Sequence, residues 1–196
     1  MTKLLIATLI VTLGLTACGP KSRETAEARA YLKGVHTKEQ AMNKAFPVSS
    51  VPRLRQTFEE ICIANPGQLG EIERLAFERG YFLFVTRPDG LRAFVSKSGE
   101  PSILIGTTPQ KEIKGNPICA VLTQWDEEKF VQLQNYVGSY PGAELLVERE
   151  FSVFSSLRRG KAYKIQEEPK QQMLVAGEFP MGGLGSTVAL AFYTEK

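Results

Sequence analysis

The sequence predicts a single α+β domain over residues 50–196, mainly an antiparallel sheet of about eight strands with an N-terminal helical pair and one inserted helix. Apolar residues recur with helical spacing within 51–80 and 126–138. Elsewhere, short apolar segments alternate with glycine and proline turns, as is typical of strands. A chain of 196 residues is long enough for one sizeable core.

The helical pair is predicted to begin at Ser49-Ser50-Val51-Pro52, because a serine can cap a first turn and proline fits within it. The first helix then has one apolar face, formed by Leu54, Phe58, Ile61 and Cys62. Asn65-Pro66-Gly67 interrupts it. The second helix has a similar face, formed by Leu69, Ile72, Leu75 and Ala76, and Gly80 is placed as its C-terminal cap.

Four strands follow, and turn sequences separate the first three. The predicted strands are 81–86, 91–97, 102–107 and 119–122. Arg87-Pro88-Asp89-Gly90 and Ser98-Gly99-Glu100-Pro101 are the turns, and a polar loop runs from Pro109 to Pro117. Connections of hairpin length predict an antiparallel meander.

A helix and a second group of strands complete the domain. Asp126-Glu127-Glu128 suits a first helical turn, and Gly138 ends that helix. The predicted strands are 147–155, 162–167, 173–179 and 187–193. Arg158 to Lys161 is interpreted as a solvated basic turn, with contact to anionic lipid headgroups or cell-wall polymer as the alternative. Gly182 to Gly185 is interpreted as a hairpin connection that could instead admit a ligand. We expect the last strand, Thr187 to Tyr193, to be an edge strand that contacts a partner.

The N-terminal segment ends in Leu15-Thr16-Ala17-Cys18. Lys3 precedes an apolar run from Leu4 to Leu15 that is short for a membrane span, as in a secretory signal peptide. With its cysteine after a small residue, the segment resembles a bacterial lipoprotein precursor and its lipobox. The resemblance implies removal of residues 1–17 and lipidation of Cys18, which would anchor the protein in a membrane. An ordinary signal peptide or a short anchor is the alternative.

Gly19 follows the cysteine, and the same resemblance implies the periplasmic face of the outer membrane, with the inner membrane or the cell surface as alternatives. Residues 18–49 are rich in Lys, Arg, Glu and Ala, so we expect a flexible tether. A coil of that length would hold the domain roughly 30 Å from its anchor, and about 100 Å when fully extended.

Cys62 and Cys119 are expected to form a disulfide, because the bacterial periplasm is oxidising. A zinc site or a redox-active pair is the alternative, but the chain has one histidine, His36, and no Cys-x-x-Cys. The order of Phe58-x-x-x-Cys62, a helix closing at Gly80, strands and Cys119 also resembles small single-disulfide periplasmic proteins of unassigned role, over residues 50–140. That resemblance implies no catalytic residue.

Motifs for catalysis are missing from the sequence. It contains no Gly-x-Ser-x-Gly, and a Ser-His-Asp triad could draw only on His36. Lys97-Ser98-Gly99 lacks the Ser-x-x-Lys that penicillin-binding enzymes also need, so it is interpreted as a hairpin end. The neighbouring carboxylates are interpreted as solvated residues: Glu59-Glu60, Asp126-Glu127-Glu128, Glu148 with Glu150, and Glu167-Glu168. We expect no enzyme activity, cofactor or metal.

A net charge of +3 for the whole chain, together with the export signal, argues against nucleic acid as a partner. The sequence therefore predicts a lipid-anchored envelope protein with a non-catalytic role in protein interaction or envelope assembly. Two alternatives stay open. One is a binder of a small ligand such as a lipid or cell-wall fragment, and the other is a hydrolase with two facing carboxylates.

Overall fold

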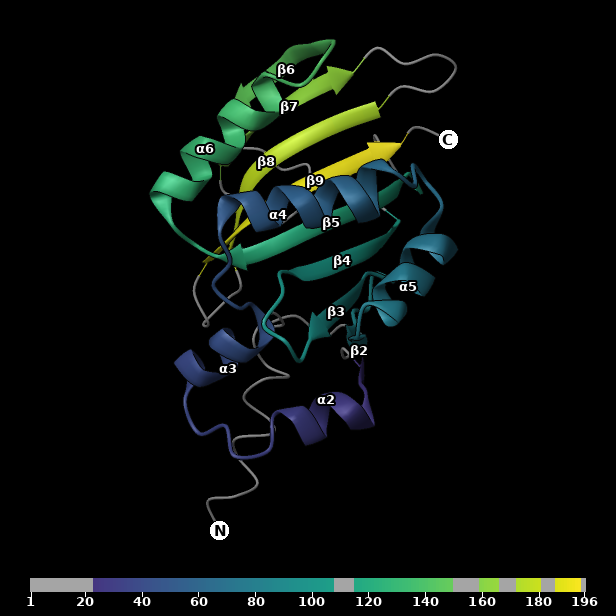
Figure 1. Ribbon diagram of the computed structural model, residues 1–196, viewed down its shortest axis with the longest axis vertical. Coiled ribbons are helices and arrows are strands. Elements are labelled where there is room, and N and C mark those ends of the chain that lie inside the picture. The colour runs from purple at the N-terminus through teal and green to yellow at the C-terminus, as the bar shows by residue number, and fades with distance from the viewer. Residues whose placement is uncertain (1–22, 108–114, 150–158, 166–171, 181–185, 195–196) are drawn as a thin grey trace.

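The computed structural model describes residues 23–107, 115–149, 159–165, 172–180 and 186–194. They form one antiparallel sheet made of two meanders (Figure 1). The strands are β1 (Arg23–Glu24), β2 (Tyr81–Thr86), β3 (Arg92–Ser96), β4 (Ser102–Thr107), β5 (Pro117–Gln124), β6 (Ala143–Arg149), β7 (Arg159–Ile165), β8 (Gln172–Pro180) and β9 (Ser186–Thr194). Within the described residues the order is β1-β2-β3-β4-β5-β9-β8-β7-β6.

Each meander follows a helical segment, and the two meanders meet at their last strands. β5 pairs with β9 from Ile118↔Tyr193 to Gln124↔Thr187. All pairings are antiparallel, as the turn sequences predicted. The α+β class is therefore confirmed, although the described part of the sheet has nine strands because the short β1 joins its edge.

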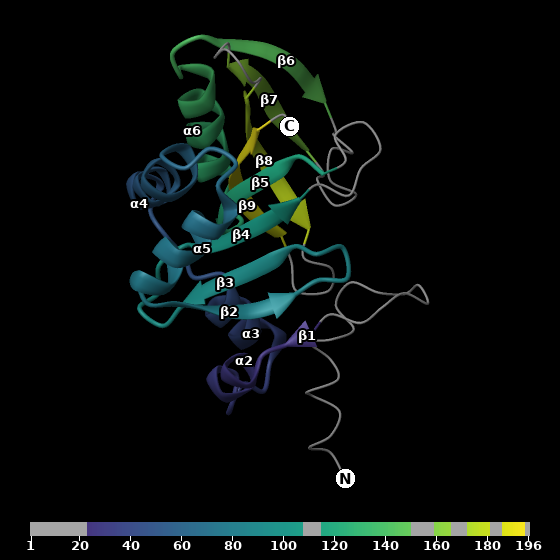
Figure 2. The same cartoon turned by 90° about the vertical axis from the view of Figure 1, so that its right-hand side faces the viewer.

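Four helical segments cover one face of the sheet (Figure 2). They are α4 (Val51–Thr57), η1 (Phe58–Ile63), α5 (Leu69–Glu78) and α6 (Glu127–Gly138). η1 is a π-helical continuation of α4. Ser50 caps α4 by accepting a hydrogen bond from the Arg53 amide, and Asp126 caps α6 by accepting one from the Lys129 amide. The predicted helical pair and the inserted helix are thus present.

The opposite face is partly covered by residues that the sequence assigned to a tether. α2 (Ala26–Tyr31) and α3 (Lys38–Ala45) pack there. Thr25 caps α2, and Thr37 forms a capping box with Gln40 at the start of α3. The apolar side chains of this segment are buried against the sheet: Ala28, Met42, Ala45 and Phe46. The prediction of a flexible segment over 18–49 is therefore wrong for residues 23–49.

Hydrogen bonds to two strand ends fix the passage from α3 to α4. Thr123 accepts from the Ser49 amide at 2.9 Å and donates to the Pro47 carbonyl at 2.6 Å. Ser102 donates to the Ala45 carbonyl. These polar side chains are buried, so pairing them with the chain avoids a desolvation cost.

The second meander differs in detail from the prediction. β6 begins at Ala143, four residues before the predicted start at Val147, and the predicted part beyond 149 lies outside the described residues. Residues 159–161 belong to β7 instead of a turn. β9 lies between β5 and β8, so the prediction that residues 187–193 form an edge strand is wrong. Eight consecutive buried residues along β9 reflect this central position.

Candidate functional site

A disulfide joins the helical layer to the middle of the sheet. Cys62 in η1 and Cys119 in β5 are bonded, with their Cα atoms 5.4 Å apart. Both are buried in the cluster that also contains Phe58 and Phe192. The predicted pairing is thus confirmed for the described residues, and the bridge belongs to the core. Cys18, the predicted lipid attachment site, lies outside the described residues.

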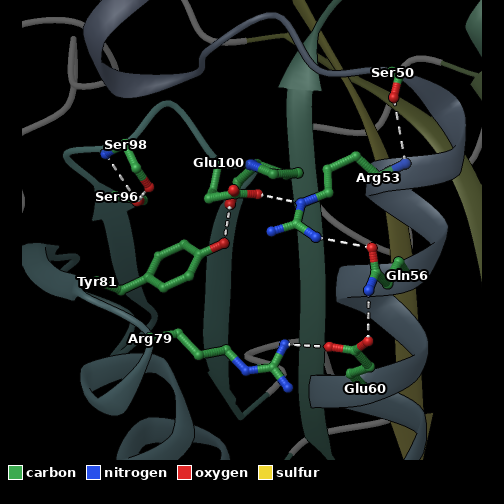
Figure 3. A network of polar contacts seen from close by, with 10 residues as sticks. Ser50, Arg53, Gln56, Glu60, Arg79, Tyr81, Ser96, Ser98 and Glu100 are labelled. Atoms are coloured by element: carbon green, nitrogen blue, oxygen red, sulfur yellow. Dashed lines mark hydrogen bonds and ion pairs between the residues drawn. The ribbon is translucent and has the colours of Figure 1, made fainter.

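A chain of polar contacts crosses the rim between α4, η1 and the start of the first meander (Figure 3). Arg53 forms an ion pair with Glu100 in the β3–β4 turn and donates to Gln56 Oε1 at 2.8 Å. Gln56 donates to Glu60 at 2.8 Å, and Arg79 forms an ion pair with the same carboxylate. The network therefore connects three segments that are distant in sequence.

The protonation states in this network suit a structural role, in which the side chains hold the segments together, better than a catalytic one. The hydrogen bond from Gln56, followed by that from Arg79, lowers the pKa of the Glu60 carboxyl, which keeps it ionised at neutral pH. Burial raises the pKa of the Tyr81 hydroxyl, which donates to the Pro101 carbonyl at 2.9 Å. Neither group is poised to exchange a proton near pH 7, as a general acid or base would need.

A second polar cluster attaches α6 to the neighbouring helix. The Tyr136 hydroxyl donates to Glu59 at 2.8 Å, and the Arg55 guanidinium lies 4.2 Å from the Tyr136 ring centroid. Burial, with a smaller contribution from the bond to Glu59, raises the pKa of Tyr136. Glu59 and Glu60, adjacent in sequence, are thus each committed to a different structural contact.

Arg159 performs a similar role between β7 and α6. Its guanidinium pairs with Glu127 and with the buried Glu178, and it lies 4.7 Å from the ring centroid of Trp125. The sequence placed Arg159 in a solvated basic turn, but the structure gives it two carboxylate partners. Among the predicted carboxylate groups, Glu150, Glu167 and Glu168 lie outside the described residues.

β6 forms one edge of the sheet. Leu145 and Leu146 are adjacent in this strand and are 47% and 48% exposed. A bulge between Leu145 and Val147 interrupts the pairing with β7 there. In the described part of the chain, no strand pairs with the outer side of β6, whereas the short β1 covers β2 at the other edge. An open edge with two half-exposed leucines can add a strand from another chain.

The chain matches no protein-family model, no curated protein and no solved structure. Its functional surfaces are accordingly identified from its own geometry.

Two other features are absent from the described part of the chain. The described residues contain no group of three or more His, Cys, Asp and Glu side chains placed to hold a metal ion. They also contain no helix with the length and apolar character needed to cross a membrane.

Sequence reasoning missed the β6 edge because it began that strand at Val147. The signal was present in Ala143-Glu144-Leu145-Leu146-Val147, an apolar run directly after Pro141-Gly142. The two consecutive leucines cannot both face the core in a regular strand, since side chains alternate between faces. Such a pair indicates a bulge or an exposed apolar position, and here the structure has both.

Proposed function

We propose that this protein is a lipid-anchored lipoprotein of the bacterial outer membrane, facing the periplasm, whose domain binds another envelope protein and has no catalytic role. Two features support the location. Leu15-Thr16-Ala17-Cys18 supplies the lipidation signal, and the buried Cys62–Cys119 disulfide suits an oxidising compartment. The polar clusters support the binding role, because their carboxylates are engaged in contacts between elements.

The open edge of β6 is the observation that carries the binding role. Backbone groups on an unpaired edge give affinity to an added strand, and apolar side chains beside them give it specificity. Leu145 and Leu146 provide such side chains, and Val131 of α6 is a further half-exposed apolar residue in this half of the domain.

The occupant is an extended apolar segment of a different envelope protein. Leu145 and Leu146 would pack against its apolar side chains, and a basic residue of the segment would complement the exposed Glu144.

Site-specific photocrosslinking in cells tests this proposal. A photoreactive amino acid replaces Leu145 in the full-length tagged protein, and the matched control carries it at Phe77 of α5, whose side chain is 49% exposed. We expect a discrete crosslinked product from position 145 that is absent at position 77. Equal products at both positions, or none at 145, would contradict the assignment of this edge.

The anchor is tested separately by metabolic labelling with palmitate. The full-length protein should incorporate the label, and Cys18→Ala should not. Labelling that persists in Cys18→Ala, or that is lacking in the parent protein, would exclude the proposed attachment site.

A further inference from the structure

We infer that the anchor holds the α2–α3 end of the domain against the membrane, where exposed basic residues contact anionic lipid headgroups. This inference rests on the proposed anchor at Cys18. It follows from the distance between that residue and the start of the fold, and from the distribution of charge along the molecule.

The distance between Cys18 and the first residue of the folded domain has an upper limit set by chain geometry. Arg23 is already part of the sheet, paired with Thr86. Only residues 19–22 separate it from Cys18. Five Cα-to-Cα steps span at most about 18 Å whatever their conformation. The spacer of about 100 Å that the sequence allowed is thus excluded by the folding of residues 23–49.

The position of β1 decides which end of the molecule lies at the membrane. β1 extends the sheet beyond β2, and α2 packs beside it (Figure 2). α6 and β6 lie at the other end of the long axis (Figure 1). A lipid on Cys18 therefore brings α2 and α3 to the bilayer and directs the β6 edge away from it.

The membrane-proximal end exposes several cations. They are Arg23, Arg29, Lys33 and Lys38. Within the described residues, none of the four forms a salt bridge. Of the acidic residues nearby, Glu27 is exposed but paired with Lys97, Glu24 is half-buried and interacts with Arg29, and Glu39 is exposed.

The far end has no such excess of basic residues. Along α6, β6 and β7 the five acidic residues are matched by five basic ones: Asp126, Glu127, Glu128, Glu144 and Glu148 against Lys129, Arg149, Arg159, Lys161 and Lys164. An anionic membrane surface attracts basic residues and repels acidic ones within about 8 Å, the Debye length at physiological ionic strength. The basic residues and the lipid anchor thus favour the same orientation. An acyl chain and a basic patch combine in this way to hold a protein at a membrane surface.

Quenching of a fluorophore by labelled lipid headgroups tests the orientation. The protein used begins at Cys18 and contains every described residue. With Cys62 and Cys119 bonded, Cys18 is the free thiol and can be coupled to a maleimide lipid in vesicles. A fluorescent amino acid is placed at Lys33 in one sample and at Glu144 in another. In phosphatidylglycerol-containing vesicles with a headgroup quencher, we expect several-fold stronger quenching at position 33. Equal quenching at both positions would overturn the orientation.

Charge reversal separates the electrostatic contribution from the short link. With a fluorophore at Gln40, Lys33→Glu/Lys38→Glu should reduce quenching on phosphatidylglycerol vesicles, whereas the matched control Lys129→Glu/Lys164→Glu should not. All four lysines lie on the surface or are half-buried, and an unchanged unfolding midpoint would show that each variant is folded. Quenching that is the same for both variants, or the same on phosphatidylcholine vesicles, would overturn the role of the basic residues.

This assay does not depend on lipidation in the cell, because the lipid is attached chemically. Failure of palmitate labelling would remove the proposed native anchor and leave the measured orientation standing. Failure of the quenching test would leave the anchor and remove the membrane-facing surface. The two outcomes are therefore distinguishable.

Discussion

Gly106 in β4 occupies a position where the fold has no room for a side chain. A Cβ atom there would lie 2.8 Å from Leu91 Cδ2 and 3.1 Å from Leu91 Cα. Leu91 is buried against the sheet face that α2 and α3 cover, here called the second face, so it has little space to move. We expect Gly106→Ala to reduce the free energy of unfolding by about 1–3 kcal/mol, the usual cost of overpacking, as measured by urea denaturation.

Gly70 provides the matched control for this prediction. It lies in the first turn of α5, and an added Cβ would meet no heavy atom within 4 Å. Gly70→Ala should leave stability unchanged or raise it by up to about 1 kcal/mol, because alanine is the better helix former. Equal losses for the two variants would show that close contact with Leu91 is not the cause.

At the scale of elements, the disulfide makes the strongest single connection between layers. It links η1 to β5 across 57 residues of sequence. The chain-entropy argument gives about 4 kcal/mol for a loop of this length as an upper value, and measured effects are often smaller. We expect reduction with dithiothreitol to lower the free energy of unfolding by about 2–4 kcal/mol. Cys62→Ala/Cys119→Ala should be insensitive to the reductant, and an equal response in that variant would contradict the assignment.

The elements that could be predicted from sequence are those with a local signal. The serine cap at Ser50, the acidic start at Asp126 and the turn at Asp89-Gly90 each depend on neighbours in the chain, and the structure has a helix or strand boundary at each. The disulfide was predictable because the chain has only two cysteines besides Cys18. The β6 start was missed because a bulge disrupts the alternation on which strand prediction depends.

Strand order is set by the whole molecule, and local pattern does not encode it. Each half consists of helix followed by a four-stranded meander, and the halves join through β5 and β9. The alternation in Thr187–Tyr193 is the same for an edge strand and for a central one, so the sequence alone suggested an edge. Its alternate small residues, Ala189 and Ala191, are buried on the second face. In the described part of the chain, the strand at the open edge of the sheet is consequently β6.

Contacts with a sheet that forms from distant residues also explain why residues 23–49 were mistaken for a tether. Their apolar residues are few and widely spaced, so the segment resembles a solvated chain until a sheet face is available to cover. Met42 and Phe46 are then buried with Phe82 and Leu104. α2 and α3 therefore form part of the domain, and removing their contacts should destabilise all of it.

Met42→Ala tests this directly. Because Met42 is 5% exposed and packs in the cluster on the second face, its truncation should lower the free energy of unfolding by about 2–4 kcal/mol. Val48, six residues later and 65% exposed, is the control, and Val48→Ala should change stability by less than about 0.5 kcal/mol. If both variants unfolded at the same urea concentration as the parent, residues 23–49 would act as a tether after all. The link from Cys18 to the folded domain would then be long enough to free that domain from the membrane surface.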